Sequence, residues 1–276
     1  MLLSTRRDTL LEEVRRRGSA RFDELAAALD VSGMTVRRDI DLLAGEGLVL
    51  KVRGGVTAVK QAPSRQTRHD VANTAHRREK EAIARLAATL VEPGMSVGLS
   101  AGSTSWFLAR ELRWIPEVTV VTNSLLVPDL FAEHDAGSPD VPSPAVVLTG
   151  GVRTPADALV GPVAVRSLGN LHCDIVFVSV HGMDPHAGFT MPNLLEAETN
   201  RALLASGRRT VVLADHTKWE AVSLTTVADL AAVDVVVVDE GLSEDQAAQM
   251  RQHVSDLRLA PFASESAPAG PPRQGL

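Results

Sequence analysis

The chain has 276 residues, of which 45% are hydrophobic and 22% charged, so it is long enough for a small domain plus a larger one, each with its own core. Only 3% of the residues are aromatic and none is Tyr, which argues against nucleic-acid recognition by stacking bases on aromatic side chains. The net charge of −6 is unevenly spread: residues 1–60 carry 11 Lys and Arg against 9 Asp and Glu, and the remainder carries 17 against 25. Residues 1–60 thus form a mildly basic head, and residues 61–276 form an acidic body. This distribution indicates that only the head binds a polyanion.

The single cysteine, Cys173, excludes an internal disulfide framework and fits a reducing compartment. It lies in the apolar run HCDIVFVSV, which favours a buried structural thiol over a nucleophile. The N-terminus lacks an apolar core of signal-peptide length, and no apolar run approaches the roughly 20 residues of a membrane span. We therefore expect a cytoplasmic protein with no membrane partner.

The first sixty residues are predicted to form three short helices and a hairpin. The first helix, over 5–17, is expected to end at Gly18. Asp23 is expected to cap the second helix and Ser32 the third. The stretch LVLKVRGGVTAV then alternates as two strands around a Gly-Gly turn.

The third helix has the layout of a helix that reads DNA. Its helical wheel separates three apolar residues from three that point away from them: Val36, Ile40 and Leu43 against Met34, Arg38 and Asp41. Arg37 and Arg38 are expected to contact phosphates, while Met34, Thr35 or Arg38 meets base edges. In the hairpin, Lys51 and Arg53 are predicted phosphate ligands. The alternative is a solvated charged helix, but cap, wheel and hairpin together favour binding to double-stranded DNA.

After a polar segment over 61–78, predicted to be a linker, helical stretches alternate with apolar runs. These runs are MSVGL, VTVVT, AVVLTG, DIVFVSV, RTVVLAD and VDVVVVD. Near-continuous apolar strands with intervening helices indicate a parallel sheet covered on both faces. We predict this α/β domain over 79–257 and a disordered tail over 258–276, which is rich in Pro, Ser and Gly.

Each apolar run ends in small or polar residues, and in an open parallel sheet a ligand lies beyond these carboxyl ends. The ends are 100–105, 122–124, 150–151, 181–184 and 214–219. In LSAGSTS, Gly102, Ser103 and Thr104 open a helix, where backbone N–H groups and hydroxyls favour an anion. Lys218 would add a positive charge. The alternative is that small residues after a strand form only a tight turn.

The stretch DELAAALDVSGMTVRRDIDLLAGEGLVLKVRGG resembles the winged helix-turn-helix of the DeoR family of bacterial transcriptional regulators. The matching positions are Ser32, Thr35, Val36, Arg37, Arg38, Asp39, Ile40, Gly54 and Gly55. The body resembles the C-terminal domain of the same family at 100–104, 122–124, 150–151, 181–184 and 215–218, and that domain is similar to sugar-phosphate isomerases and deaminases. The resemblance covers nearly all of residues 1–257, with one departure, because Ser100 stands where the family usually has Asp.

This resemblance implies an N-terminal winged helix-turn-helix followed by a larger Rossmann-like, sugar-phosphate-isomerase-like domain with a mostly parallel sheet. It also implies a repressor that binds its operator as a homo-oligomer, a dimer or tetramer, and responds to a phosphorylated sugar. The expected DNA contacts are Ser32, Met34, Thr35, Arg37, Arg38, Lys51, Arg53 and Gly54. The expected effector contacts are Ser100, Gly102, Ser103, Thr104, Asn123, Gly151, Asp184 and Lys218.

A second hypothesis is an isomerase or deaminase that acts on a sugar phosphate. Asp184, Glu196 or Glu198 would be its general base, and Lys218 or His216 its electrophilic partner. An enzyme has no need of the basic head, so we favour a regulator without catalytic residues or cofactor. The sequence contains no HxH, HExxH or CxxC pair, and we expect no metal site.

Overall fold

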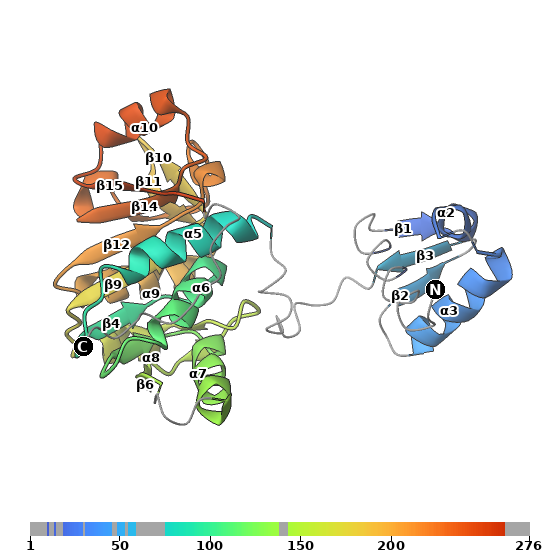
Figure 1. The fold of residues 1–276 in the computed structure, drawn as a ribbon, viewed down its shortest axis with the longest axis horizontal. Helices are drawn as coiled ribbons and strands as arrows, with labels where there is room; N and C mark the ends of the chain where they lie inside the picture. Colours follow the sequence, from blue (N-terminus) through green and yellow to red (C-terminus); the bar gives the residue numbers. More distant parts are fainter. Residues whose placement is uncertain are drawn as a thin grey trace, which may run out of the picture. The chain divides into compact units, whose positions relative to one another are not determined.

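The computed structural model describes Leu10, Val14 and residues 19–29, 31–45, 49–52, 55–58, 75–137 and 143–262 (Figure 1). The chain divides into two units, Met1–Ser64 and Arg65–Leu276. The part of the predicted linker before residue 75 and the part of the predicted tail after residue 262 lie outside the described residues.

The first unit packs helices against a small antiparallel sheet. Its described elements are β1 (Ser19–Arg21), α2 (Phe22–Ala28), α3 (Gly33–Gly45), β2 (Val49–Val52) and β3 (Gly55–Ala58), with strand order β1-β3-β2. Leu10 and Val14 of the predicted first helix are helical and fully buried, and they join a core with Leu25, Val36 and Ile40. The winged helix-turn-helix is therefore confirmed, with β1 as a third strand that the sequence did not predict.

The two predicted helix caps of this unit differ in outcome. Ser32 caps α3, because its Oγ accepts a hydrogen bond from the Thr35 amide at 3.2 Å. The expectation for Asp23 was wrong: α2 begins at Phe22 and its N-cap is Arg21, whose own amide donates to Glu24 Oε2 at 3.2 Å. Asp23 therefore lies inside the first turn.

The second unit is built on a seven-stranded sheet. Its strands are β4 (Ser96–Leu99), β5 (Thr119–Thr122), β6 (Ala145–Leu148), β9 (Ile175–Ser179), β12 (Thr210–Leu213), β14 (Val235–Asp239) and β15 (Leu257–Ala260). All neighbours pair in parallel, in the order β15-β14-β12-β9-β4-β5-β6. Six strands match the predicted apolar runs. The seventh, β15, has three of its four residues in the predicted tail, so the sheet continues past the predicted boundary at 257.

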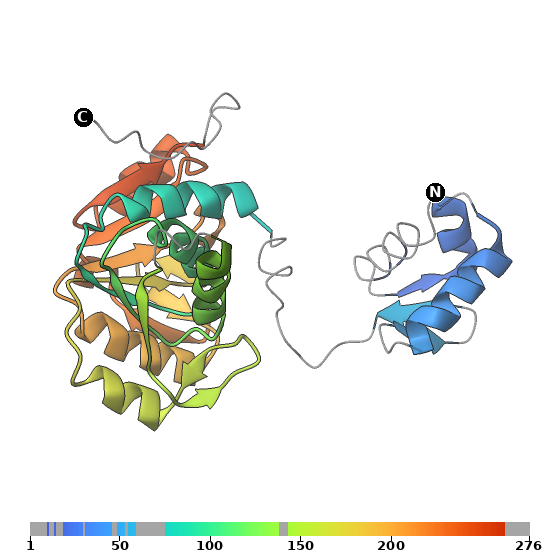
Figure 2. The same ribbon diagram turned by 60° about the horizontal axis from the view of Figure 1, so that its bottom comes forward.

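Helices cover both faces of this sheet, as predicted (Figure 2). On one face lie α5 (Arg77–Ala88), α6 (Ser103–Leu112) and α7 (Leu126–Gly137), and on the other α8 (Pro162–Leu168), α9 (Leu194–Ala205) and α10 (Glu244–Arg251). Side chains of one strand point alternately to the two faces of the sheet. In β14, Val235 and Val237 pack in the core under α5, α6 and α7, and Val236 and Val238 pack in the core under α8, α9 and α10. Since α5 begins at Arg77, the predicted linker ran two residues too far.

Short antiparallel strands extend the loops between the main elements. One pair is β7 (Val152–Arg153) with β8 (Leu159–Val160), and a three-stranded sheet joins β10 (Gly182–Asp184), β11 (Gly188–Met191) and β13 (Thr225–Ala228). Two short 3-10 helices follow β12 and β13: η1 (His216–Lys218) and η2 (Leu230–Ala232). In the described part of the chain, no helix is both long and apolar enough to cross a membrane.

Candidate DNA-binding surface and ligand pocket

Helix α3 presents one polar face to solvent. Val36 and Ile40 are fully buried, whereas the side chain of Met34 is 79% exposed and those of Arg37 and Arg38 are exposed as well. The wheel predicted this division, because residues three and four apart share a helix face. The arginines and Met34 are thus available to a duplex, near the capped end of the helix.

Two of the basic side chains in this unit have a partner within it. The guanidinium of Arg37 lies 5.6 Å from the centre of the Phe22 ring, a cation–π contact. Lys51 of β2 forms an ion pair with Asp41 of α3, and both side chains are about half exposed. A phosphate would therefore compete with Asp41 for Lys51. Arg53 and Gly54 lie outside the described residues.

The sheet of the second unit has a topological switch point between β4 and β9. From β4 the chain moves outward through β5 and β6 on one side, and from β9 it moves outward through β12, β14 and β15 on the other. The loops that leave β4 and β9 therefore turn away from each other and open a crevice at the carboxyl ends of the two strands. Open α/β sheets bind their ligands at such a crevice.

A pocket of about 210 Å³ lies at this switch point. It is lined by Lys80, Ala101, Gly102, Ser103, Thr104, Ala156, Ala158, Ser179, Val180, His181, Met191, Glu196, Asp215 and Lys218. These residues come from α5, α6 and α9, from β9 and β11, and from the segments that follow β4, β7, β9 and β12. Four predicted effector residues line the pocket: Gly102, Ser103, Thr104 and Lys218.

Gly102 allows the loop after β4 to pass close to β9. Its backbone has φ 138° and ψ 159°, a region that essentially only glycine adopts. A Cβ at this position would lie 2.4 Å from Ser179 Oγ. Gly102 is also the N-cap of α6, so the first turn of that helix, whose N–H groups have no acceptor within the helix, begins in the lining of the pocket.

Ser100 lies beneath this loop instead of lining the pocket. Its side chain is fully buried, and its Oγ lies 3.2 Å from Ser105 Oγ and accepts a hydrogen bond from the Ser179 amide at 3.0 Å. The oxygens of Ser105 and Ser179 are 3.1 Å apart, which completes a buried cluster of three hydroxyls. The cluster joins the end of β4 to the end of β9 without any charge.

Three further predicted effector residues hold loops and do not line the pocket. Asn123 is buried, accepts from the Ala101 amide at 2.7 Å and donates to the Leu159 carbonyl at 3.1 Å. Asp184 accepts from the amides of His186 and Ala187, each at 2.8 Å, and so fixes the β10–β11 turn. At Gly151 a Cβ would lie 2.5 Å from the Val160 carbonyl oxygen. Asn123 and Asp184 thus hold loops by hydrogen bonds to backbone groups, and Gly151 allows a close approach of two backbone segments.

The pocket brings together residues of both charges. Burial lowers the pKa of Lys80, although Asp215 nearby raises it, and Lys218 lowers it further. Burial also lowers the pKa of His181, and the charges of Lys218 and Lys80 act in the same direction. Burial raises the pKa of Glu196, which a hydrogen bond with Thr154 opposes. The positive charge of Lys218 thus lowers the pKa of both Lys80 and His181.

Lys80 is the pocket residue that sequence reasoning missed most clearly. It lies in α5, twenty residues before the loop after β4, and its side chain is only 8% exposed. A signal was present: Lys80 shares the apolar stripe of α5 with Ile83, Ala84 and Ala87, which follow it at three, four and seven residues. A lysine in such a stripe is placed toward the interior.

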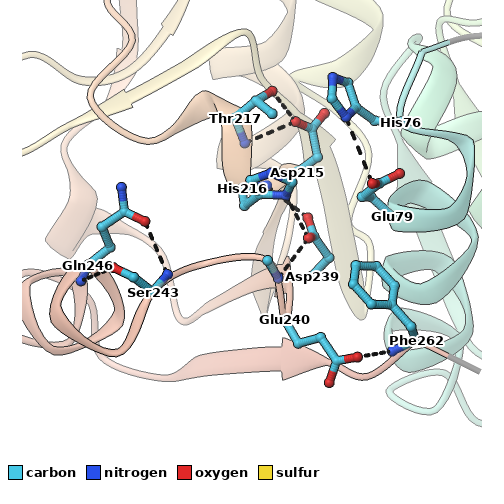
Figure 3. A network of polar contacts seen from close by, with 11 residues as sticks. His76, Glu79, Asp215, His216, Thr217, Asp239, Glu240, Ser243, Gln246 and Phe262 are labelled. Atoms are coloured by element: carbon cyan, nitrogen blue, oxygen red, sulfur yellow. Dashed lines mark hydrogen bonds and ion pairs between the residues drawn. The ribbon is translucent and has the colours of Figure 1, made fainter.

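The turn that carries Lys218 is held by buried carboxylates (Figure 3). Asp239 is fully buried, and it accepts from the His216 amide at 2.8 Å while its other oxygen lies 2.7 Å from His216 Nδ1. Asp215 accepts from the Thr217 amide at 3.2 Å. Among the residues proposed for the enzyme hypothesis, Glu196 and Lys218 line the pocket, whereas Asp184, Glu198 and His216 do not. Within the described residues, no group of His, Cys, Asp and Glu is arranged to hold a metal ion.

Both units match protein-family models. Residues 6–62 match the DeoR-like helix-turn-helix domain, and residues 75–240 match the DeoR C terminal sensor domain. The chain belongs to the DeoR family of transcriptional regulators. The family resemblance read from the sequence is thereby confirmed.

Curated relatives of this DeoR-family regulator align over most of their length. The HTH-type transcriptional regulator GolR of Listeria innocua is 32% identical over 80% of this chain and 84% of that protein. The L-fucose operon activator of Haemophilus influenzae is 31% identical over 91% and 98%, and the putative aga operon transcriptional repressor of Escherichia coli O157:H7 is 28% identical over 90% and 91%. A solved D-ribose-5-phosphate isomerase in complex with phospho-erythronic acid is 17% identical over 51% of this chain and 52% of that chain, with a TM-score of 0.37. A likeness at this level says nothing about activity.

Proposed function

We propose that this DeoR-family regulator is a repressor that binds operator DNA through α3 and its hairpin, and that a phosphorylated sugar in the pocket changes its DNA affinity. The observation that carries the proposal is the pocket itself. It joins the first turn of α6 to Lys80 and Lys218 at the switch point of the sheet. Helix N-termini and lysines are the groups with which proteins hold phosphate.

The charges of the pocket support a phosphorylated ligand. Lys218 disfavours the charged form of Lys80, and burial does the same. A phosphate dianion between the two ammonium groups would favour both charged forms and accept hydrogen bonds from them. An apolar ligand or a second cation would gain nothing from this arrangement.

The other lining residues support a sugar as the remainder of the ligand. Asp215 and Glu196 accept hydrogen bonds, and Ser103 and Thr104 both donate and accept them, so sugar hydroxyls would find partners. Two of the relatives are named for the aga and L-fucose operons, and a Staphylococcus aureus relative, 30% identical over 85% of this chain and 91% of that protein, is a lactose phosphotransferase system repressor. These names support a sugar-related ligand for this chain.

The protein is proposed to act without catalysis and as a homo-oligomer. Of the three acids considered as a general base, Glu196 lines the pocket, whereas Asp184 is occupied by two backbone amides and Glu198 does not line the pocket. The GolR, L-fucose operon and aga operon relatives are all named as regulators of transcription. A dimer or tetramer would present two α3 helices to a two-fold symmetric operator, which is how helix-turn-helix proteins read their sites.

Thermal unfolding of the full chain tests the ligand. Glucose 6-phosphate, fructose 6-phosphate and ribose 5-phosphate would each be compared with the sugar that lacks the phosphate. The phosphosugar that fits is expected to raise the Tm, because a ligand at a hundred times its Kd stabilises the native state by about 2.7 kcal/mol. Lys218→Ala is expected to abolish this shift.

Arg208→Ala is the matched control, since it removes an exposed positive charge that does not line this pocket. It should respond to the phosphosugar like the wild type. A Lys218→Ala variant that also responds like the wild type would place the phosphate elsewhere.

A further inference from the structure

The start of α5 is held by residues that line the pocket or adjoin it. Lys80 Nζ donates a hydrogen bond to the carbonyl oxygen of Ala75 at 2.8 Å, and the same lysine lines the pocket. Ala75 is the first described residue after the segment 59–74, which connects the two units along the chain. One ammonium group thus lies between the proposed ligand and the end of the connecting segment.

His76 provides a second attachment at the same place. Its backbone is left-handed, with φ 58° and ψ 41°, and its ring meets the ring of His216 edge-on with centroids 6.0 Å apart (Figure 3). Nδ1 of His76 lies 3.9 Å from Glu79 Oε1. His216 is itself fixed by the buried Asp239 and follows Asp215 of the pocket. The turn at 75–76 is therefore built against residues next to the pocket.

A phosphate oxygen is a stronger acceptor for the Lys80 ammonium than the carbonyl oxygen of Ala75. A carbonyl oxygen is neutral, whereas hydrogen bonds to a phosphate oxygen are assisted by charge and roughly twice as strong. The side chain is confined, because it is 8% exposed and its neighbours in the stripe of α5 are buried. A phosphate in the pocket would therefore compete with the Ala75 carbonyl for this ammonium.

We infer that Lys80 links the pocket to the connecting segment: a phosphate draws its ammonium from the Ala75 carbonyl and releases residue 75. The inference rests on the proposed function and names how the same site is coupled to the DNA-binding unit. The ligand favours the released arrangement because Lys80 can then turn its ammonium fully toward the phosphate, with which it forms the stronger, charge-assisted hydrogen bond. Such a differential contact is what a ligand needs to shift a conformational equilibrium.

A fluorescent label at residue 75 tests the release directly. Ala75 is exposed, and Ala75→Cys leaves its backbone carbonyl in place. The native Cys173 is buried and burial raises its pKa, so a maleimide dye labels the introduced cysteine preferentially. Inorganic phosphate is the probe, with chloride at equal ionic strength as the control. We expect the fluorescence anisotropy of the label to fall when phosphate is added.

Variants at residue 80 distinguish this coupling from a purely structural role. Lys80→Gln is too short to keep the bond to Ala75, so its label should show the low anisotropy before phosphate is added and no further fall afterwards. Lys80→Arg retains the charge and reach and should restore part of the response. Arg85→Gln, which removes an exposed charge from the same helix, should behave like the wild type.

Phosphate binding is measured on the same samples by isothermal titration calorimetry. Lys80→Gln is expected to bind phosphate several-fold more weakly, and the anisotropy is compared at saturation. A full phosphate response in saturated Lys80→Gln would overturn the coupling while leaving the proposed ligand intact. Absence of phosphate binding to the wild type would overturn the proposed function, and this inference with it.

Discussion

Arg38→Ala is expected to weaken operator binding by about 1–3 kcal/mol, or roughly five- to 150-fold, because its side chain lies on the exposed face of α3. Arg37→Ala is expected to remove a phosphate contact and to reduce the slope of log K against log salt by about 0.9. Fluorescence anisotropy with a duplex selected by the protein from a random pool, measured at several salt concentrations, gives both quantities.

Arg38→Ala is easier to interpret than Arg37→Ala. The Arg37 guanidinium also packs over Phe22, a core residue, so Arg37→Ala combines lost binding with lost packing, and its Tm must be measured alongside. Arg251→Ala serves as control for the lost charge, because Arg251 is exposed on α10 of the other unit. Unchanged affinity and an unchanged salt slope in both variants of α3 would show that this helix does not read DNA.

Gly102→Ala is expected to weaken ligand binding strongly with little loss of overall fold. The backbone there is in a glycine-only region, which costs an alanine about 1–3 kcal/mol of stability. In addition, the new Cβ would lie 2.4 Å from Ser179 Oγ, about 1 Å short of ordinary contact. The loop and the end of β9 must separate, so we expect phosphosugar affinity to fall at least about tenfold, or about 1.4 kcal/mol.

Gly94→Ala separates the two effects of that substitution. Gly94 also has a positive φ, 83°, but a Cβ there would meet nothing within 4 Å. It should lower the Tm through backbone strain, at a cost of about 1–2 kcal/mol, and leave ligand affinity unchanged. Calorimetric titration of both variants with the phosphosugar measures the difference. If Gly102→Ala binds as tightly as Gly94→Ala, the loop after β4 does not form the ligand site.

Elements with strong periodicity could be predicted from the sequence. The stripe of Val36 and Ile40 located α3, and the six apolar runs located six strands, since a strand buried on both faces is apolar throughout. Short or half-exposed elements were missed. Strand β1 has three residues, too few for a period, and β15 reads LRLA with only its last residue buried. Pairing with neighbouring strands, not local sequence, defines these two.

The ligand pocket could be predicted only in part, because local sequence patterns do not show which strands are neighbours in the sheet. The ends of β4, β9 and β12 contribute to the pocket, and the end of β4 contains Gly102 and its neighbours as expected. Asn123, at the end of β5, instead holds the loop after β4 from below. Lys80 belongs to α5, which lies next to the pocket in space, although its sequence lies outside the strand ends from which the pocket was predicted.

The measurement that tests the account most directly is the operator affinity of the full chain with and without the phosphosugar found by thermal unfolding. At equal ionic strength, the phosphosugar is expected to change the operator Kd by about five- to 150-fold, the usual range for coupled sites, while the sugar without phosphate leaves it unchanged. The same operator Kd in the presence of saturating phosphosugar would contradict the account.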